Sequence, residues 1–322
     1  MTHKTHSPIQ NTLCLIRSVG ERTTSWCEHL LKQVFPADHV QRIGEVPFSA
    51  TVRKGFELGG DSGLKWTLCI DADVLPNPDG VRELIQFAET AEEQVFEVHG
   101  VILDKYIPCK RPAGNHLYRN ALVDKAIGLI PEEGTAKRPE SATKKAMAKE
   151  GFPWYQTSVY MGLHDFEQYY ADIYRKAFLH AVKHRKALPL VEKYWRNRKS
   201  DDLDYEIALA GALAGKIYDG TVFVDKRFLE EESLSVLKAK NIQEKVSLTD
   251  LKSSARLVED IESSFAIDPV VQQKQWPRYQ ESFLRGVPLS KHKQLTKHAL
   301  KRLGSLMIAS GTHLKQLAKD IH

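Results

Sequence analysis

The chain has 322 residues, of which 42% are hydrophobic and 27% are charged, with a formal net charge of +5 at pH 7. This composition is typical of a globular protein with one large or two ordinary domains. The mild positive charge is compatible with an anionic substrate such as a nucleotide diphosphate, but it does not indicate a nucleic-acid-binding protein.

Strands and helices alternate through the first hundred residues. Apolar runs bounded by turn residues predict four strands, at Thr12–Ile16, around Val40–Val46, at Trp66–Asp71 and at Val95–Leu103. Helical patterns between them cover about residues 21–35, 49–58 and 81–93. This alternation is typical of an α/β sheet with parallel strands.

The pattern changes beyond residue 104. The sequence predicts, in chain order, a loop over 108–115, a helix over 117–129, a charged loop passing into a short helix over 130–150, a strand over 157–163 and a strongly helical stretch over about 166–195. A charged segment over 185–200 then interrupts the pattern. We therefore expect one domain at residues 1–190 and a helical C-terminal region at residues 191–322.

The most informative segment is KWTLCIDADVLPNP, residues 65–78, in which an apolar strand ends at Asp71 and is followed by Asp73. In open α/β sheets, ligands bind beyond the carboxyl ends of the strands. Two carboxylates at such a place hold a hard cation, which can in turn clamp a diphosphate. The ordinary alternative is that both aspartates cap a turn. A calcium loop is not predicted, because the required glycine and glutamate do not follow at the right spacing.

This D-x-D strand, preceded by β/α units from the N-terminus, resembles the GT-A glycosyltransferases, and residues 12–185 look like a bacterial family-2-type enzyme. The matching segments are LCLIRSVGERT, VPFSATVRKGFELG, WTLCIDADVLP and VYMGLHDFEQYY. The resemblance implies a Rossmann-like mixed sheet flanked by helices, with a helical C-terminal region. It also implies a hexosyltransferase (EC 2.4) that moves a sugar from a nucleotide-sugar donor to a hydroxyl of a glycan, lipid or protein.

The resemblance further implies that Asp71 and Asp73 hold Mn²⁺ or Mg²⁺ against the donor diphosphate, with a histidine from later in the chain. We choose His164 for this histidine; His99 is the competitor and His116 a more distant one. The alternative for His164 is an incidental place before a helix that Asp165 caps.

Basic residues are expected to bind the nucleotide diphosphate or the base. Arg17 and Arg22 flank the turn after the first strand, and Arg53 and Lys54 lie in the helix before the motif strand. Surface salt bridges are the ordinary alternative for all four. The interval from the first strand to Asp71 is shorter than is usual in this fold, so that one strand-helix step is expected to be trimmed and the residue that contacts the base is not identified.

An inverting transferase needs a general base near the acceptor hydroxyl, whereas a retaining one does not use a base in that way. Asp104 and Asp165 are the candidates, and the stereochemistry stays open. In the segment GNHLYRNALVDKA, Tyr118 and Arg119 are candidates for stacking on an acceptor sugar and hydrogen-bonding it. The alternative for Tyr118 is packing against the sheet.

The C-terminal segment from residue 285 is strongly basic, and its leucines, with Met307, predict an amphipathic helix. Such a helix either lies on an anionic membrane surface or packs on the protein. The membrane surface would suit an enzyme that glycosylates a lipid-linked or cell-envelope glycan. The N-terminus does not predict a signal peptide, the four cysteines form no CxxC pair, and no apolar run reaches a membrane span. We therefore expect a cytoplasmic protein, peripheral at the inner face of the membrane if the tail binds there.

Two rival functions remain. A haloacid-dehalogenase-type phosphatase also presents D-x-D after a strand and would use Asp71 as its nucleophile. That family has threonine or valine where this chain has Leu75. The other rival is a non-enzymatic adaptor that binds polyanions through its basic tail.

Overall fold

The structure is a computed structural model that describes residues 7–248, 257–263, 265, 267–275 and 282–286. The chain divides into two compact units, residues 1–285 and 286–322. The account below concerns the first unit. The basic tail from residue 287 onward lies outside the described residues, and so do the predictions made for it.

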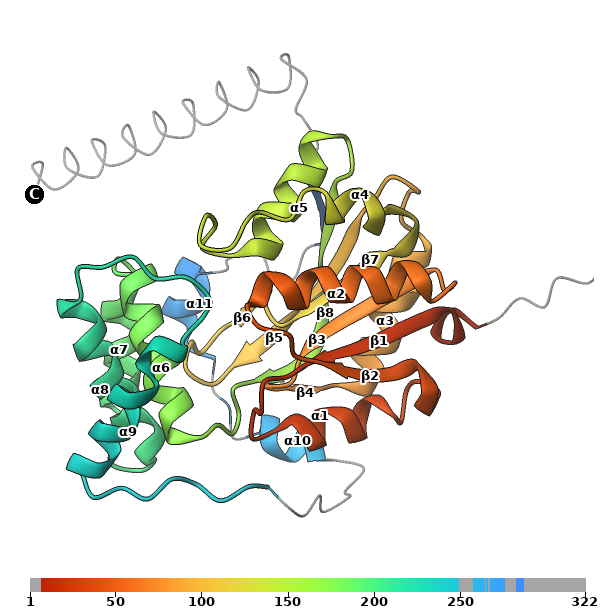
Figure 1. Ribbon diagram of the computed structural model, residues 1–322. Coiled ribbons are helices and arrows are strands. Elements are labelled where there is room, and N and C mark those ends of the chain that lie inside the picture. Colours follow the sequence, from red (N-terminus) through yellow and green to blue (C-terminus); the bar gives the residue numbers. More distant parts are fainter. Residues whose placement is uncertain (1–6, 249–256, 264, 266, 276–281, 287–322) are drawn as a thin grey trace, which may run out of the picture. The chain divides into compact units, whose positions relative to one another are not determined.

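One mixed sheet forms the centre of the unit (Figure 1). Its main path follows the order β2-β1-β3-β7-β5-β8-β4, while β6 pairs with β5 and β9 with β8. The strands are β1 (Thr12–Arg17), β2 (Val40–Ile43), β3 (Trp66–Asp71), β4 (Val74–Pro76), β5 (Glu97–Asp104), β6 (Lys110–Arg111), β7 (Asn115–Arg119), β8 (Trp154–His164) and β9 (Phe283–Arg285).

Five of the strands run in the same direction. β1 is parallel to β2 and β3, and β5 is parallel to β8. β7 lies antiparallel to both β3 and β5, so these two strands also share a direction. The carboxyl ends of β1, β3, β5 and β8 therefore meet at one edge of the sheet. The mixed sheet flanked by helices agrees with the fold class implied by the resemblance.

Helices cover both faces of this sheet. The helices are α1 (Thr24–Leu31), α2 (Phe48–Asp61), α3 (Pro78–Glu89), α4 (Val123–Ile127), α5 (Pro139–Lys149), α6 (Tyr170–Lys183), α7 (Leu188–Arg196), α8 (Leu203–Ile217), α9 (Glu230–Ala239), α10 (Leu257–Glu262) and α11 (Pro269–Gln275). Successive side chains of a strand point to opposite faces. In β1, Cys14 and Ile16 join a core with α1 and α3, whereas Leu13 and Leu15 join a second core with α2, α4 and α5.

A third core lies among α6, α7, α8 and α9 (Figure 1). Tyr174 of α6, Trp195 of α7 and Ala208 of α8 are buried in it together. Residue 190, the expected domain boundary, lies in α7, and the division at this residue stays a prediction. No helix within the described ranges is long and apolar enough to cross a membrane.

Most predicted elements are present, with one clear correction. The expected helix over 117–129 is wrong in its first part, because Asn115–Arg119 is strand β7 and only Val123–Ile127 is α-helical. Leu117 points into the core with α1 and α3, and Tyr118 into the opposite core, as a strand between two neighbours requires. The short strands β4, β6 and β9 were not predicted.

Candidate functional site

The candidate site lies where the parallel strands end. Arg17 at the end of β1 is in register with Asp71 at the end of β3, and Asp104 at the end of β5 is in register with His164 at the end of β8. All four residues, with Asp73 and Asp165, line one cavity of about 880 Å³. The chain thus brings residues from four strands to one place, as expected for a ligand site at this edge of an α/β sheet.

Asp73, His164 and Asp165 form a compact group that can hold a metal ion. Each offers a ligand atom, and these atoms lie within 4.8 Å of one another. The Nε2 atom of His164 lies 3.5 Å from Oδ1 of Asp73, and this Oδ1 is buried without a hydrogen-bond partner in the described part of the chain. Two carboxylates and one imidazole suit Mn²⁺ or Mg²⁺. The residues present therefore fit a divalent metal.

The ring of His164 is held in place by two other carboxylates. Its Nδ1 lies 2.9 Å from Oδ2 of Asp104 and 3.0 Å from Oδ2 of Asp165. Asp104 is itself fixed, because its Oδ1 accepts hydrogen bonds from the backbone N–H groups of Tyr106 and Ile107. With Nδ1 occupied in this way, Nε2 is the ring atom that faces Asp73, the arrangement typical of a histidine that binds a metal.

The backbone around Asp165 supports this arrangement. Its φ angle is 59°, in the left-handed region that non-glycine residues seldom adopt, and its N–H donates to the carbonyl of Asp73 over 3.0 Å. Such backbone strain persists where the surrounding structure fixes it, and it is often found at functional sites.

The charges of this group do not cancel. Three carboxylates, Asp73, Asp104 and Asp165, meet two permanent cations, because Lys176 pairs with Asp73 and Asp165, and Arg111 pairs with Asp104. Burial alone would lower the pKa of His164, but the carboxylates of Asp165 and Asp73 raise it to about 10. The remaining negative charge thus attracts either a proton on His164 or a metal cation.

All three carboxylates remain ionised in this environment. Burial alone would raise the pKa of Asp73, Asp104 and Asp165, but Lys176, Arg111 and His164 lower it. Lys176 contacts Oδ2 of Asp73 and so leaves its Oδ1 free for another ligand.

Asp71, the first aspartate of the motif, has a different environment from Asp73. Its Oδ1 lies 2.8 Å from an Nη atom of Arg17, which also pairs with Glu140 on α5. Burial raises the pKa of Asp71, with the Arg17 guanidinium opposing it. Asp71 does not belong to the compact group of metal-ligating atoms, although it lines the same cavity.

Five predicted site residues do not line the main cavity, and Arg22 is one of them. Arg53 is exposed on α2 and Lys54 is half-buried beside it. Tyr118 is buried in the sheet, where its hydroxyl donates to Glu140 over 3.1 Å. Arg119 is buried as well and donates to the carbonyls of Ala91, Glu92 and Val95.

Arg22 lies in a smaller hollow of about 480 Å³ that shares residues 18, 20, 21, 44 and 169 with the main cavity. It pairs there with Glu167, and its Nε donates to the carbonyl of Val246 over 2.9 Å. Its guanidinium is therefore beside the site rather than in it.

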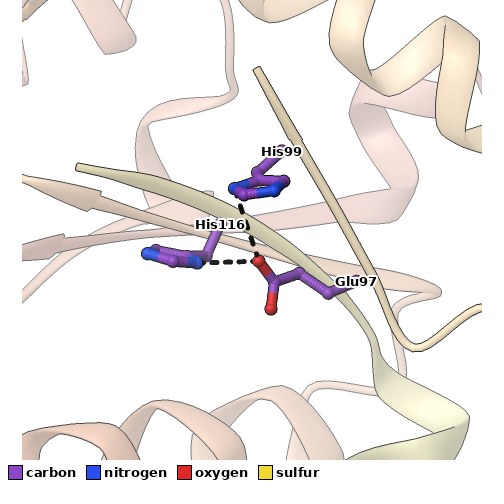
Figure 2. A group of neighbouring side chains, drawn as sticks. All are labelled: Glu97, His99 and His116. Atoms are coloured by element: carbon purple, nitrogen blue, oxygen red, sulfur yellow. Dashed lines mark hydrogen bonds and ion pairs between the residues drawn. The ribbon is translucent and has the colours of Figure 1, made fainter. Parts of the chain in front are cut away.

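Glu97, His99 and His116 form a second group of possible metal ligands, of which the two histidines line the same cavity. Figure 2 shows both rings directed at one carboxylate oxygen of Glu97. His116 Nδ1 lies 2.9 Å and His99 Nδ1 3.7 Å from Oε1 of Glu97. Lys144 lies 3.0 Å from the same Oε1. Although burial would raise the pKa of Glu97, Lys144 and the two histidines lower it. The charge of its single carboxylate is thus offset by Lys144, which lies outside the group.

Sequence reasoning identified Arg17 but missed two other cations of the site. Lys176 comes from the middle of α6, and Arg111 from the two-residue strand β6. Neither follows a strand end or belongs to a motif, so only the fold brings them to the carboxylates.

No protein-family model matches the chain, and a search of curated proteins finds no match. Among solved structures, the mannosyltransferase PcManGT from Pyrobaculum calidifontis in complex with GDP-Man and Mn²⁺ has a TM-score of 0.35 and 14% identity, over 85% of each chain. A glycosyltransferase involved in the glycosylation of the major capsid of PBCV-1 has a TM-score of 0.32 and 13% identity, over 48% of this chain and 80% of that one. A197 from STIV has a TM-score of 0.31 and 11% identity, over 48% and 82%. At these TM-scores the likenesses carry no argument of their own.

Proposed function

We propose that the chain is a metal-dependent glycosyltransferase that moves a sugar from a nucleotide-sugar donor to a hydroxyl of a glycan, lipid or protein. The observation that carries the proposal is the free Oδ1 of Asp73, which faces Nε2 of His164 in the large cavity at the strand ends. Arg17, a phosphate-binding residue type, lies at the same edge beside Asp71. A cytoplasmic location and a cell-envelope acceptor stay predictions.

Asp73 and His164 would hold the metal, with Asp165 as the third residue of the group. Bound there, a divalent cation would neutralise the charge that develops on the departing diphosphate. The guanidinium of Arg17 would bind a phosphate oxygen of the donor, since its Nε is buried without a hydrogen-bond partner among the described residues.

Asp104 and Asp165 were the candidates for the general base, but positioning roles fit them better. A base must take up a proton near the working pH. The cations around both carboxylates lower their pKa values even though burial raises them, and each already accepts a hydrogen bond from His164. We therefore assign to them the orientation of the imidazole, with its proton kept on Nδ1.

Release of nucleoside diphosphate from GDP-mannose and UDP-glucose tests the proposal. The full chain should hydrolyse or transfer from a donor with Mn²⁺ and lose this activity with EDTA. Asp73→Asn should lower the activity at least tenfold, because it removes a charged ligand from the metal. Asp61→Asn, at an exposed position on α2, is the matched control and should change nothing.

Two results would contradict the proposal. One is donor hydrolysis that neither EDTA nor Asp73→Asn reduces. The other is hydrolysis of p-nitrophenyl phosphate that depends on Asp71, without any action on nucleotide sugars, since this would indicate the phosphatase chemistry in which that aspartate is the nucleophile.

A further inference from the structure

A group of basic side chains lines one side of the main cavity, and we call it the cationic corner. It consists of Arg111 in β6, Arg138 directly before α5, His180 and Lys183 in the last turn of α6, and His184 directly after that helix. Three separate segments of the chain thus bring positive charge or imidazole donors to one place.

Four of these five side chains lack an acidic partner among the described residues. Within the described part of the chain, Arg138, His180, Lys183 and His184 make no ion pair with a carboxylate; Arg138 Nη2 instead lies 3.3 Å from His184 Nε2. Arg111 pairs with Asp104, yet its Nε is buried without a hydrogen-bond partner, and so is Nε2 of His180. Buried polar atoms in proteins are normally hydrogen-bonded, so two such nitrogens in a cavity indicate a missing ligand.

The electrostatics of the corner agree with a place for a missing ligand. Burial, then the charges of Arg138 and Lys137, lower the pKa of Lys183 to about 8. Burial also lowers the pKa of His180 to about 3, with His184, Arg111 and Arg138 adding to the effect of burial. At pH 7 the positive charge of the corner is therefore carried by Arg111, Arg138 and Lys183 against mutual repulsion, whereas His180 is neutral.

A simpler reason for basic residues here is the C-terminus of α6, whose partial negative charge favours cations. This reason covers Lys183 and His180, which lie in the last turn. It does not cover Arg138, which directly precedes α5, nor the two unpartnered nitrogens. It also fails to explain why the pKa of Lys183 is lowered, since a favourable helix end would raise it.

We propose that the cationic corner binds a phosphate group carried by the acceptor. The proposal rests on the glycosyltransferase function proposed above. Phosphate is the class of ligand that arginine and lysine side chains with free N–H donors recognise. The donor diphosphate is assigned to the metal group and to Arg17. There, unlike in the corner, each cation already has a carboxylate partner. Arg111 joins the two places, since its guanidinium pairs with Asp104, the carboxylate that holds His164.

Inorganic phosphate is the probe for this site. Isothermal titration calorimetry of the full chain should detect its binding, and Arg138→Ala and Lys183→Met should each weaken it about tenfold, the usual loss for one charge-assisted hydrogen bond. Lys193→Met, at an exposed position on α7 that does not line the cavity, is the matched control and should leave the affinity unchanged. No phosphate binding by the unaltered chain, or equal binding by all variants, would overturn the proposal.

A second titration, with GDP and Mg²⁺ at saturation, separates the two sources of phosphate. Phosphate binding that persists and still depends on Arg138 supports a site for the acceptor. Displacement of phosphate by GDP, together with weaker GDP binding by Arg138→Ala, would assign the corner to the donor and overturn the proposal. Donor hydrolysis by the unaltered chain is measured alongside, so that a failure of the proposed function is recognised separately from a failure to bind phosphate.

Discussion

Replacement of Lys183 by methionine should make the protein more stable at neutral pH. The pKa of this lysine is about 8, against an ordinary value of 10.5, because burial and neighbouring cations disfavour its charge. Without solvent screening, this difference in pKa corresponds to about 3 kcal/mol, at about 1.4 kcal/mol for each pKa unit. The side chain is half-buried, and solvent screening reduces the effect. We therefore expect Lys183→Met to raise the free energy of unfolding by about 1 kcal/mol at pH 7.

The pH dependence of this gain has a definite sign. Between pH 8 and pH 10.5 the unfolded chain binds more protons at Lys183 than the folded chain, so the folded state gains stability as the pH rises through this window. The penalty is complete below pH 8 and disappears above pH 10.5. The advantage of Lys183→Met should therefore shrink as the pH rises from 7 to 10.

Urea unfolding of both proteins at pH 7 and pH 10 measures this difference, and other groups that titrate in the window cancel in the comparison. Lys193→Met should show no gain at either pH. A variant at residue 183 that is less stable than the unaltered chain at pH 7, or whose advantage is the same at pH 10, would refute the electrostatic reasoning.

The remaining predictions concern the metal group, the sheet and the tail. His164→Ala should weaken Mn²⁺ binding at least tenfold in calorimetric titration in the presence of GDP, whereas His99→Ala should not; equal affinities would exclude His164 as a ligand. Gly162→Ala should cost about 3 kcal/mol or more in urea unfolding, since its φ is 133° and an added Cβ would lie 2.1 Å from the carbonyl oxygen of Leu75. Gly63→Ala, at a φ of 67° with nothing within 4 Å, should cost only about 1 kcal/mol, and an equal cost at both positions would contradict the steric argument. A chain that ends at residue 285 should retain donor hydrolysis, because every residue that lines the cavity lies between 17 and 230; loss of activity in a folded, soluble truncation would show that the tail takes part.

The strand ends of the site could be predicted from the sequence because each follows a local pattern. Asp71, Asp104 and His164 all come after apolar runs, and parallel strands bring their carboxyl ends to one edge. The prediction did not include Lys176 or Arg111, which belong to segments with no such pattern. Their place depends on how α6 and β6 pack, and local periodicity does not contain that information.

Strand β7 was missed for a related reason. Asn115–Arg119 is only five residues long and runs directly into a helical segment, so the helical character of the residues after 120 dominated the pattern. The two faces of the strand are nevertheless distinct, with Leu117 in one core and Tyr118 in the other. Because Tyr118 and Arg119 lie in this central strand, they are held within the protein rather than presented to an acceptor.

The strand registers also bear on how quickly the site can take up a metal. The pairings of Arg17 with Asp71 and of Asp104 with His164 belong to the hydrogen-bonded ladder of the sheet, so the backbone at these residues is ordered once the protein has folded. Ordering of binding groups before the ligand arrives removes part of the entropic cost of binding. Only the side chain of Lys176 and the proton of His164 have to rearrange. Metal entry should therefore proceed at the rate of side-chain motion, without a refolding step, and leave the circular dichroism of the backbone unchanged.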